Sequence, residues 1–233
     1  KDDEVILEHD FFANPLSFST LNLFLTCPRK YYYTKIAGIK PAKGVAKELG
    51  TKQGNSVHSA LFEYYTSEFY KQNNTFDLAV FKEMLAKQNL TPLEFEIWTH
   101  KFKEYEIYEN ERLRAGFRVL ECEKEVQSEF CGVQIKGFID RIDADANGDV
   151  LILDYKTGEA NVNSLQLAFY EALFGSEARS AYYALKNEPS LVSSKKSVED
   201  LNGEIEKLKA INKTKINFER KSSACAFCEY ATL

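Results

Sequence analysis

Long apolar segments are missing from this 233-residue sequence. No apolar run approaches the roughly 18–20 residues that a membrane-spanning helix requires, and no signal-peptide pattern opens the chain. We therefore expect no membrane association and a cytoplasmic location. Methionine is also scarce: Met84 is the single methionine, and the chain starts at Lys1. We therefore expect this sequence to be a fragment of a longer polypeptide.

Paired cysteines and an excess of positive charge are also lacking. The five cysteines form an odd number, which disfavours a simple disulfide scaffold and fits a reducing compartment. The net charge of −5 argues against a generic basic nucleic-acid binder. The remaining composition, 44% hydrophobic and 28% charged, is ordinary for a soluble globular protein, and 233 residues suffice for one domain over residues 1–233.

The most informative pattern is a predicted β-hairpin near the middle of the chain. Asp140 lies in the segment Gly137–Asp143, and Asp154 begins the segment Asp154–Gly158 fourteen residues later. The turn signal Asn147-Gly148 lies between them. Because side chains alternate along a strand, Asp154 and Lys156 share one face and Tyr155 points to the other.

Two carboxylates beside one lysine are typical of metal-assisted phosphodiester hydrolysis. Carboxylates bind a hard cation through oxygen, and the lysine orients or deprotonates a water molecule and neutralises developing negative charge. The alternative is a surface hairpin with solvated acids, but the apolar strand Val150–Leu153 runs directly into these charges and disfavours it.

The surrounding pattern predicts an α/β fold with a mixed central sheet. Strands are expected near 118–130, 133–143, 149–156 and 180–185, with a crossover helix at about 164–174 before the last strand. Helices near 50–73, 77–89 and 92–115 form a helical insertion over about 50–115. Ser19 is the expected N-cap of a short helix that Pro28 ends, and a polar stretch, 187–196, leads to a helix at 198–213.

Further candidate residues lie outside the hairpin. His58 lies in the first long helix, where a lone histidine is more often structural than a ligand. Gln166 and Tyr170 are four residues apart on the crossover helix and so share a face. Arg29, Lys30 and Tyr31 interleave cationic and aromatic side chains that suit a nucleic acid, although packing is the commoner explanation for a tyrosine run.

Charge is unevenly distributed along the chain. Residues 27–52 contain seven basic residues and one acidic residue, whereas residues 93–129 contain ten acidic and six basic residues. A basic segment beside an acidic metal site suits a polyanionic substrate, and a solvated charged face is the alternative of equal weight.

Two cysteines near the end of the chain, Cys225 and Cys228, are spaced to chelate a metal ion or an iron–sulfur cluster. A redox pair is disfavoured, because the motif does not open a helix after a strand.

Five segments in order resemble the RecB-like branch of the PD-(D/E)XK nucleases, and most closely the C-terminal nuclease domain of AddB-type helicase–nuclease subunits. The matching segments are 17–29, 54–58, 137–143, 154–158 and 166–170. The resemblance implies a restriction-endonuclease-like core. It also implies that His58, Asp140, Asp154 and Tyr155 hold catalytic Mg²⁺ or Mn²⁺, that Lys156 is the catalytic lysine, and that Gln166 and Tyr170 support them.

The same resemblance implies a [4Fe–4S] cluster, held by one cysteine before the nuclease core and three after it. Cys27, Cys225 and Cys228 match three of these positions, the last two in a C-terminal cysteine segment over about 214–233. The fourth cysteine would follow Leu233 directly, so we expect the cluster to be incomplete in this chain.

The expected function is a metal-dependent, exonucleolytic DNase in double-strand-break repair and recombination, acting on DNA with a helicase domain or subunit as partner. One alternative is a CRISPR-adaptation nuclease of the Cas4 type, which shares this core and the cysteine arrangement. The other is a catalytically silent module that binds DNA or docks to a subunit. The intact set of two acids and a lysine argues against silence.

Overall fold

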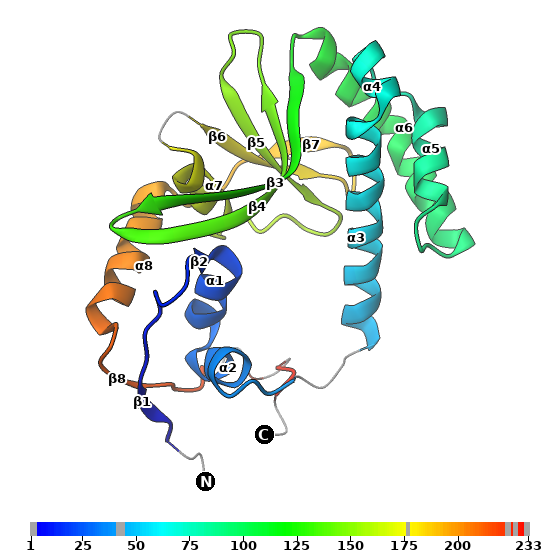
Figure 1. Cartoon of the computed structure of the whole chain (residues 1–233). Helices are drawn as coiled ribbons and strands as arrows, with labels where there is room; N and C mark the ends of the chain where they lie inside the picture. The colour runs from blue at the N-terminus through cyan, green and yellow to red at the C-terminus, as the bar shows by residue number, and fades with distance from the viewer. Residues whose placement is uncertain (1–3, 41–44, 176–177, 222–224, 226–227, 231–233) are drawn as a thin grey trace.

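A six-stranded mixed sheet forms the centre of the protein (Figure 1). The computed structural model describes residues 4–40, 45–175, 178–221, 225 and 228–230, with the backbone alone for 45–51. The strand order is β2-β4-β5-β6-β7, and β3 pairs with β4. The strands are β2 (Leu16–Ser17), β3 (Arg118–Phe130), β4 (Val133–Ala144), β5 (Val150–Lys156), β6 (Arg179–Ala184) and β7 (Ser190–Val192).

Helices flank both faces of this sheet (Figure 1). In the first part of the chain α1 (Phe18–Thr26), α2 (Pro28–Tyr31) and a π-helix, η1 (Tyr32–Ile36), follow β2. The expected insertion consists of α3 (Val45–Thr66), α4 (Glu68–Asn73), α5 (Leu78–Ala86) and α6 (Pro92–Arg114). Helix α7 (Gln166–Phe174) connects β5 to β6 as the crossover, and α8 (Val198–Ile211) follows β7.

Side-chain alternation along β5 creates two hydrophobic cores, one on each face of the sheet. Ile152 packs with α1, α7 and α8, whereas Leu151, Leu153 and Tyr155 pack against α3, α5 and α6. Strand β6 alternates in the same way. The helical insertion therefore covers the β5 and β6 part of one face of the sheet.

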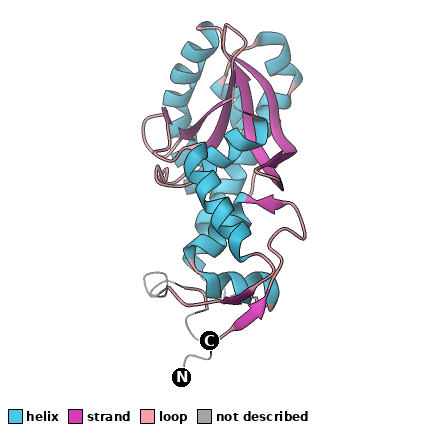
Figure 2. Cartoon of the chain, turned by 90° about the vertical axis from the view of Figure 1, so that its left-hand side faces the viewer, coloured by secondary structure: helices cyan, strands magenta, loops and turns pink. Residues whose placement is uncertain are grey.

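A second, two-stranded sheet joins segments near the two ends of the chain. Strand β1 (Ile6–Glu8) pairs antiparallel with β8 (Lys215–Asn217) at the end of the molecule where both termini lie (Figures 1 and 2). The buried guanidinium of Arg29 donates from Nε to the carbonyl of Phe218 at 2.7 Å, which ties α2 to the residue after β8.

The expected strand and helix order over 118–184 and the helix at 198–211 are confirmed, and so is the hairpin turn at Asn147-Gly148, where Gly148 has φ +89°. Several details differ from expectation. Helix α1 is capped by Ser17, not Ser19, because the Ser17 hydroxyl accepts from the Thr20 amide. Helix α1 ends at Thr26, before Pro28, as expected, and Pro28 then starts the separate helix α2, since proline is compatible with the first turn.

Two other expectations are corrected. The first long helix begins at Val45 and ends at Thr66, and Ser67 caps a separate helix α4. The polar stretch expected at 187–196 contains β7, an edge strand paired with β6. Within the described parts of the chain, no helix combines the length and apolar character needed to cross a membrane.

Gly137 allows α7 to approach β4 closely. A methyl group added there would lie 2.8 Å from Cδ1 of Leu173, a side chain fixed in the core. We predict that Gly137→Ala lowers the free energy of unfolding by about 1–3 kcal/mol, because the core must absorb this overlap. Chemical denaturation measures the change. Gly158→Ala is the control, since a methyl group there meets nothing within 4 Å, and equal stability losses in both variants would contradict the prediction.

Candidate active site

The site lies where β4 and β5 separate. Their antiparallel pairing runs from Ala144 with Val150 to Arg141 with Leu153 and then stops. Beyond this point the amide N–H of Tyr155 donates to Oδ2 of Asp140 at 2.8 Å. The Asp140 carboxylate therefore replaces a strand partner, and it lies in the opening between the two strands.

The second carboxylate lies on β5, beside the lysine. Nζ of Lys156 is 2.6 Å from Oδ2 of Asp154, which confirms that the two side chains share a face. Tyr155 points to the opposite face, where it is buried against the helical insertion. Oδ2 of Asp154 is itself buried and, apart from its ion pair with Lys156, accepts no hydrogen bond from the described residues.

Helix α7 supplies two side chains that hold this pair. Nε2 of Gln166 donates to Oδ1 of Asp154 at 2.9 Å, and its Oε1 accepts from Nζ of Lys156 at 3.0 Å. The hydroxyl of Tyr170 donates to the same Oδ1 at 3.0 Å. The spacing of four residues on the helix therefore places Gln166 and Tyr170 side by side, as expected, and both fix the orientation of Asp154.

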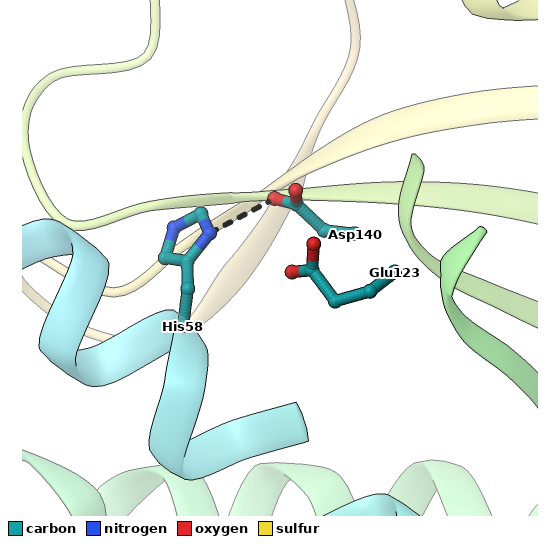
Figure 3. Close-up of side chains that lie close together, drawn as sticks. All are labelled: His58, Glu123 and Asp140. Atoms are coloured by element: carbon teal, nitrogen blue, oxygen red, sulfur yellow. Dashed lines mark ion pairs between the residues drawn. The ribbon is translucent and has the colours of Figure 1, made fainter. Parts of the chain in front are cut away.

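Ligand atoms from two further side chains lie close to Asp140 (Figure 3). One ligand atom from each of His58, Glu123 and Asp140 lies within 4.8 Å of the others. Nδ1 of His58 is 3.4 Å from Oδ2 of Asp140, and its Nε2 is 3.1 Å from the carbonyl oxygen of Tyr155. The cluster lines an open pocket of ≈ 610 Å³ together with Asn55, Ser59, Phe62 and Glu63.

The electrostatics of the cluster favour a bound cation. Burial, reinforced by the charge of Asp154, raises the pKa of the Asp140 carboxyl well above its usual range. Burial also raises the pKa of Glu123 and lowers the pKa of His58, which favours the neutral imidazole that binds metals. A divalent cation would offset the repulsion between the carboxylates, so the donor set fits Mg²⁺ or Mn²⁺.

Several donors are available to such a cation. Carboxylate oxygens come from Asp140 and Glu123, and an imidazole nitrogen comes from His58. Asp154 is not part of this cluster, although its charge raises the pKa of Asp140. Tyr155 can contribute only its main-chain carbonyl oxygen, because its side chain lies on the other face of the sheet. This mixed set suits a hard divalent ion.

Glu123 is the site residue that the sequence did not reveal. It lies on β3 with a positive φ of +49°, after a bulge between Val119 and Glu121. Strand β3 also contains the acids Glu121, Glu125 and Glu129. Because nothing in the sequence distinguishes Glu123 from these, only the backbone geometry identifies it.

The three candidate cysteines lie at a second place, near β8. Cys27, Cys225 and Cys228 are free thiols that line one pocket of ≈ 300 Å³. Cys27 follows α1 directly, and the amide of Cys228 donates to the carbonyl of Cys225 at 3.1 Å. The structure therefore brings the N-terminal cysteine and the two C-terminal cysteines of the expected set to one pocket.

The candidate nucleic-acid residues have mixed environments. Arg29 and Tyr31 are buried, and Tyr31 stacks against Phe218, so packing accounts for both. Lys30 is partly exposed and pairs with Glu229 at 2.6 Å. The expected basic segment also includes Lys43 and Lys47, whose side chains lie outside the described residues.

Comparison with known proteins agrees with this geometry. The sequence profile of the PD-(D/E)XK nuclease superfamily matches residues 15–233. The chain belongs to this superfamily. Membership confirms the expected superfamily and its mixed α/β fold, and it places the two carboxylates and the lysine within a nuclease framework. The finer resemblance to AddB-type subunits stays a prediction.

Individual relatives are distant. An uncharacterized protein of Rickettsia bellii (strain RML369-C) is 28% identical over 170 residues, which are 67% of this chain and 20% of that protein. The chain thus spans about a fifth of that relative's length. A candidate exonuclease from Eubacterium rectale shares the fold with a TM-score of 0.50 and 17% identity, over 84% of this chain and 79% of that chain. A repair endonuclease from Pyrococcus abyssi has a TM-score of only 0.25 at 18% identity, over 58% and 51% of the two chains.

We predict that Glu123 contributes to metal binding. Replacing Glu123 with Gln removes one carboxylate charge from the cluster, so the affinity for Mn²⁺ falls by about 10-fold or more. Isothermal titration calorimetry with Mn²⁺ measures the change. Glu125→Gln removes a carboxylate from the same strand outside the cluster and serves as control. Equal affinities for the two variants would contradict the role of Glu123.

Proposed function

We propose that the chain is a divalent-metal-dependent deoxyribonuclease that hydrolyses phosphodiester bonds from DNA ends. One observation carries the proposal: two carboxylates, Asp140 and Asp154, and the ammonium of Lys156 lie together where β4 and β5 separate. The chain that places them there belongs to a superfamily of nucleases. The adjacent pocket, of ≈ 610 Å³, is open to solvent, which gives a nucleotide access to the carboxylates.

The metal would be Mg²⁺ or Mn²⁺, held by Asp140, Asp154, Glu123 and His58 with the Tyr155 carbonyl. When bound, it supplies positive charge to the phosphate and lowers the pKa of a coordinated water molecule. The protein supplies the orientation of these ligands. Oδ1 of Asp154 is already occupied by Gln166 and Tyr170, so its Oδ2 is the atom available to a cation.

Lys156 is the cationic side chain of the site. Its ammonium lies between Asp154 and Gln166, and these acceptors hold it at the mouth of the separated strands. From this position it donates hydrogen bonds to the attacking water molecule or to a phosphate oxygen, and it neutralises the negative charge that develops during hydrolysis. Gln166 contacts Lys156 directly, and Gln166 and Tyr170 both hold Asp154.

The biological setting follows from the resemblance to AddB-type subunits. It supports a role in double-strand-break repair and recombination, with DNA as substrate and a helicase domain or subunit as partner. Of Arg29, Lys30 and Tyr31, Lys30 is the one that is partly exposed, so it is the candidate among them for contact with DNA. A CRISPR-adaptation nuclease and a catalytically silent DNA-binding module are the alternatives that the experiments below distinguish.

We predict that Lys156→Met abolishes Mg²⁺-dependent DNA cleavage, lowering the rate by at least about 100-fold, because charge stabilisation in the transition state is lost. Asp154→Asn has the same effect, because a neutral amide replaces a metal-binding carboxylate. Single-turnover cleavage of end-labelled DNA measures both rates, and DNA binding is measured separately by fluorescence anisotropy.

The control is Lys207→Met, which removes an exposed lysine on α8 that pairs with Glu204 far from the site in the sequence. It should cleave DNA as the parent protein does. Undiminished cleavage by both Lys156→Met and Asp154→Asn would refute the nuclease assignment. DNA binding without any cleavage by the parent protein would instead support the silent module.

The preference for DNA ends has its own test. We predict that linear DNA is degraded in the presence of Mg²⁺ while a covalently closed circle of the same sequence stays intact. Electrophoresis of both substrates over time gives the result. Nicking or linearisation of the circle at a similar rate would assign an endonuclease instead.

The cysteine pocket extends the proposal to a [4Fe–4S] cluster. We predict that the full-length protein contains iron and acid-labile sulfide after anaerobic purification. Cys228→Ser should lower both, since a thiolate ligand is lost. Cys122→Ser is the control, because this cysteine lies on β3 away from the pocket. Equal iron contents in both variants would exclude Cys228 as a ligand.

A further inference from the structure

A buried network of four charged side chains lies between the helical insertion and the sheet. Glu109 and Arg112 come from α6, and Arg141 and Asp143 come from β4. Arg112 bridges the two acids, with Nη1 3.0 Å from Glu109 and Nη2 2.8 Å from Asp143. All four are buried, and their formal charges cancel. Buried ions are tolerated only when well paired, so the geometry of this network is strictly determined.

Arg141 is the centre of the network and is completely buried. Its Nε and Nη2 bind the two oxygens of Asp143 at 2.6 and 2.9 Å, and Nη2 also binds Glu109 at 2.6 Å. Its remaining nitrogen, Nη1, donates to the hydroxyl of Tyr155 at 3.2 Å and to that of Tyr105 at 3.4 Å. Every nitrogen of the guanidinium is thus engaged.

The contact between Arg141 and Tyr155 joins the two strands of the site from behind. Arg141 directly follows Asp140, and Tyr155 directly follows Asp154. Backbone pairing of β4 with β5 ends at Arg141, so no ladder hydrogen bond fixes the distance between the two carboxylates. The side-chain contact on the reverse face and the Tyr155 amide on Asp140 take over this role.

The network also reaches the helix that carries His58. Tyr65 lies seven residues after His58, two helical turns farther along the same side of α3. The Arg141 guanidinium stacks on the Tyr65 ring, 4.3 Å from its centroid. The Tyr65 hydroxyl donates to Glu109 at 3.0 Å and lies 2.7 Å from the Tyr105 hydroxyl. One guanidinium therefore contacts all three elements that supply the candidate ligands His58, Asp140 and Asp154.

We propose that Arg141, through Tyr155 and Tyr65, sets the spacing of these ligands from the face of the sheet that packs against the helical insertion. Arg141, Tyr155 and Tyr65 are then positioning residues of the metal centre, and Tyr155 acts through its hydroxyl in addition to any role of its carbonyl. This inference rests on the proposed metal site. Its competitor is a purely structural role, in which the network stabilises the fold without affecting the geometry of the ligands.

The test uses a matched pair of tyrosine variants. Tyr155→Phe removes only the hydroxyl that Arg141 contacts, and Tyr183→Phe removes the hydroxyl that donates to Glu109 at 2.9 Å in the same network. Both side chains are buried, but β6, which carries Tyr183, supplies no ligand. Both variants should lose a similar amount of thermal stability, because each loses one buried hydrogen bond. A truncation of Arg141 is avoided, because it would leave two buried acids to share the single charge of Arg112.

The deciding measurement is the affinity for Mn²⁺, determined by calorimetry at a temperature where all variants are folded. We expect Tyr155→Phe to raise the dissociation constant by about tenfold, the effect of removing an outer-shell partner. Tyr65→Phe should raise it in the same direction, and Tyr183→Phe should leave it unchanged within about twofold. Equal affinities for Tyr155→Phe and Tyr183→Phe would overturn the inference.

Failure of this inference can be told apart from failure of the proposed function. If the parent protein binds Mn²⁺ and Asp140→Asn does not, the metal site stands. The Mn²⁺ affinities of Tyr155→Phe and Tyr183→Phe then test the positioning role alone. If the parent protein binds no Mn²⁺, the proposed function fails, and the positioning role is refuted with it.

Discussion

The geometry of the candidate site depends on the point where β4 and β5 stop pairing. Up to Arg141 and Leu153 the two strands are held by the regular ladder of a sheet. Past it, the Tyr155 amide N–H donates to the Asp140 carboxylate instead of to a strand partner. A sheet that continued its pairing would bury both acids against each other. The separation therefore leaves Asp140 on the open pocket while Asp154 stays buried beside Lys156.

The two faces of the sheet hold different parts of the site. On one face, α7 orients Asp154 and Lys156 through amide and hydroxyl groups. On the other, the helical insertion holds a neutral set of buried charges around Arg141. A single sequence segment, Asp140-Arg141, serves both faces with adjacent residues. Irregular backbone on β3 then adds Glu123 from the side, so the metal site receives ligands from elements far apart in the sequence.

Local patterns were sufficient to predict the hairpin and the residues that depend on it. The turn at Asn147-Gly148 fixes the register, and a period of two places Asp154 and Lys156 together. A helical spacing of four does the same for Gln166 and Tyr170. Glu123 could not be predicted, because its position depends on a bulge and a positive φ that its neighbours do not encode. The Arg141 network also escaped prediction, since its partner Glu109 looks like any acid of a charged helix.

The pairing of β1 with β8 has a consequence for how the protein is made. Residues of the N-terminal segment find their partners more than 200 positions later, as the bond from the Phe11 amide to Asn212 shows. During synthesis, β1 must wait without this strand partner until Lys215–Asn217 have left the ribosome. Contacts of such long range close slowly. The pocket that gathers Cys27, Cys225 and Cys228 is consequently among the last parts of the molecule to assemble, and any cluster would have to be inserted after translation of the nuclease core.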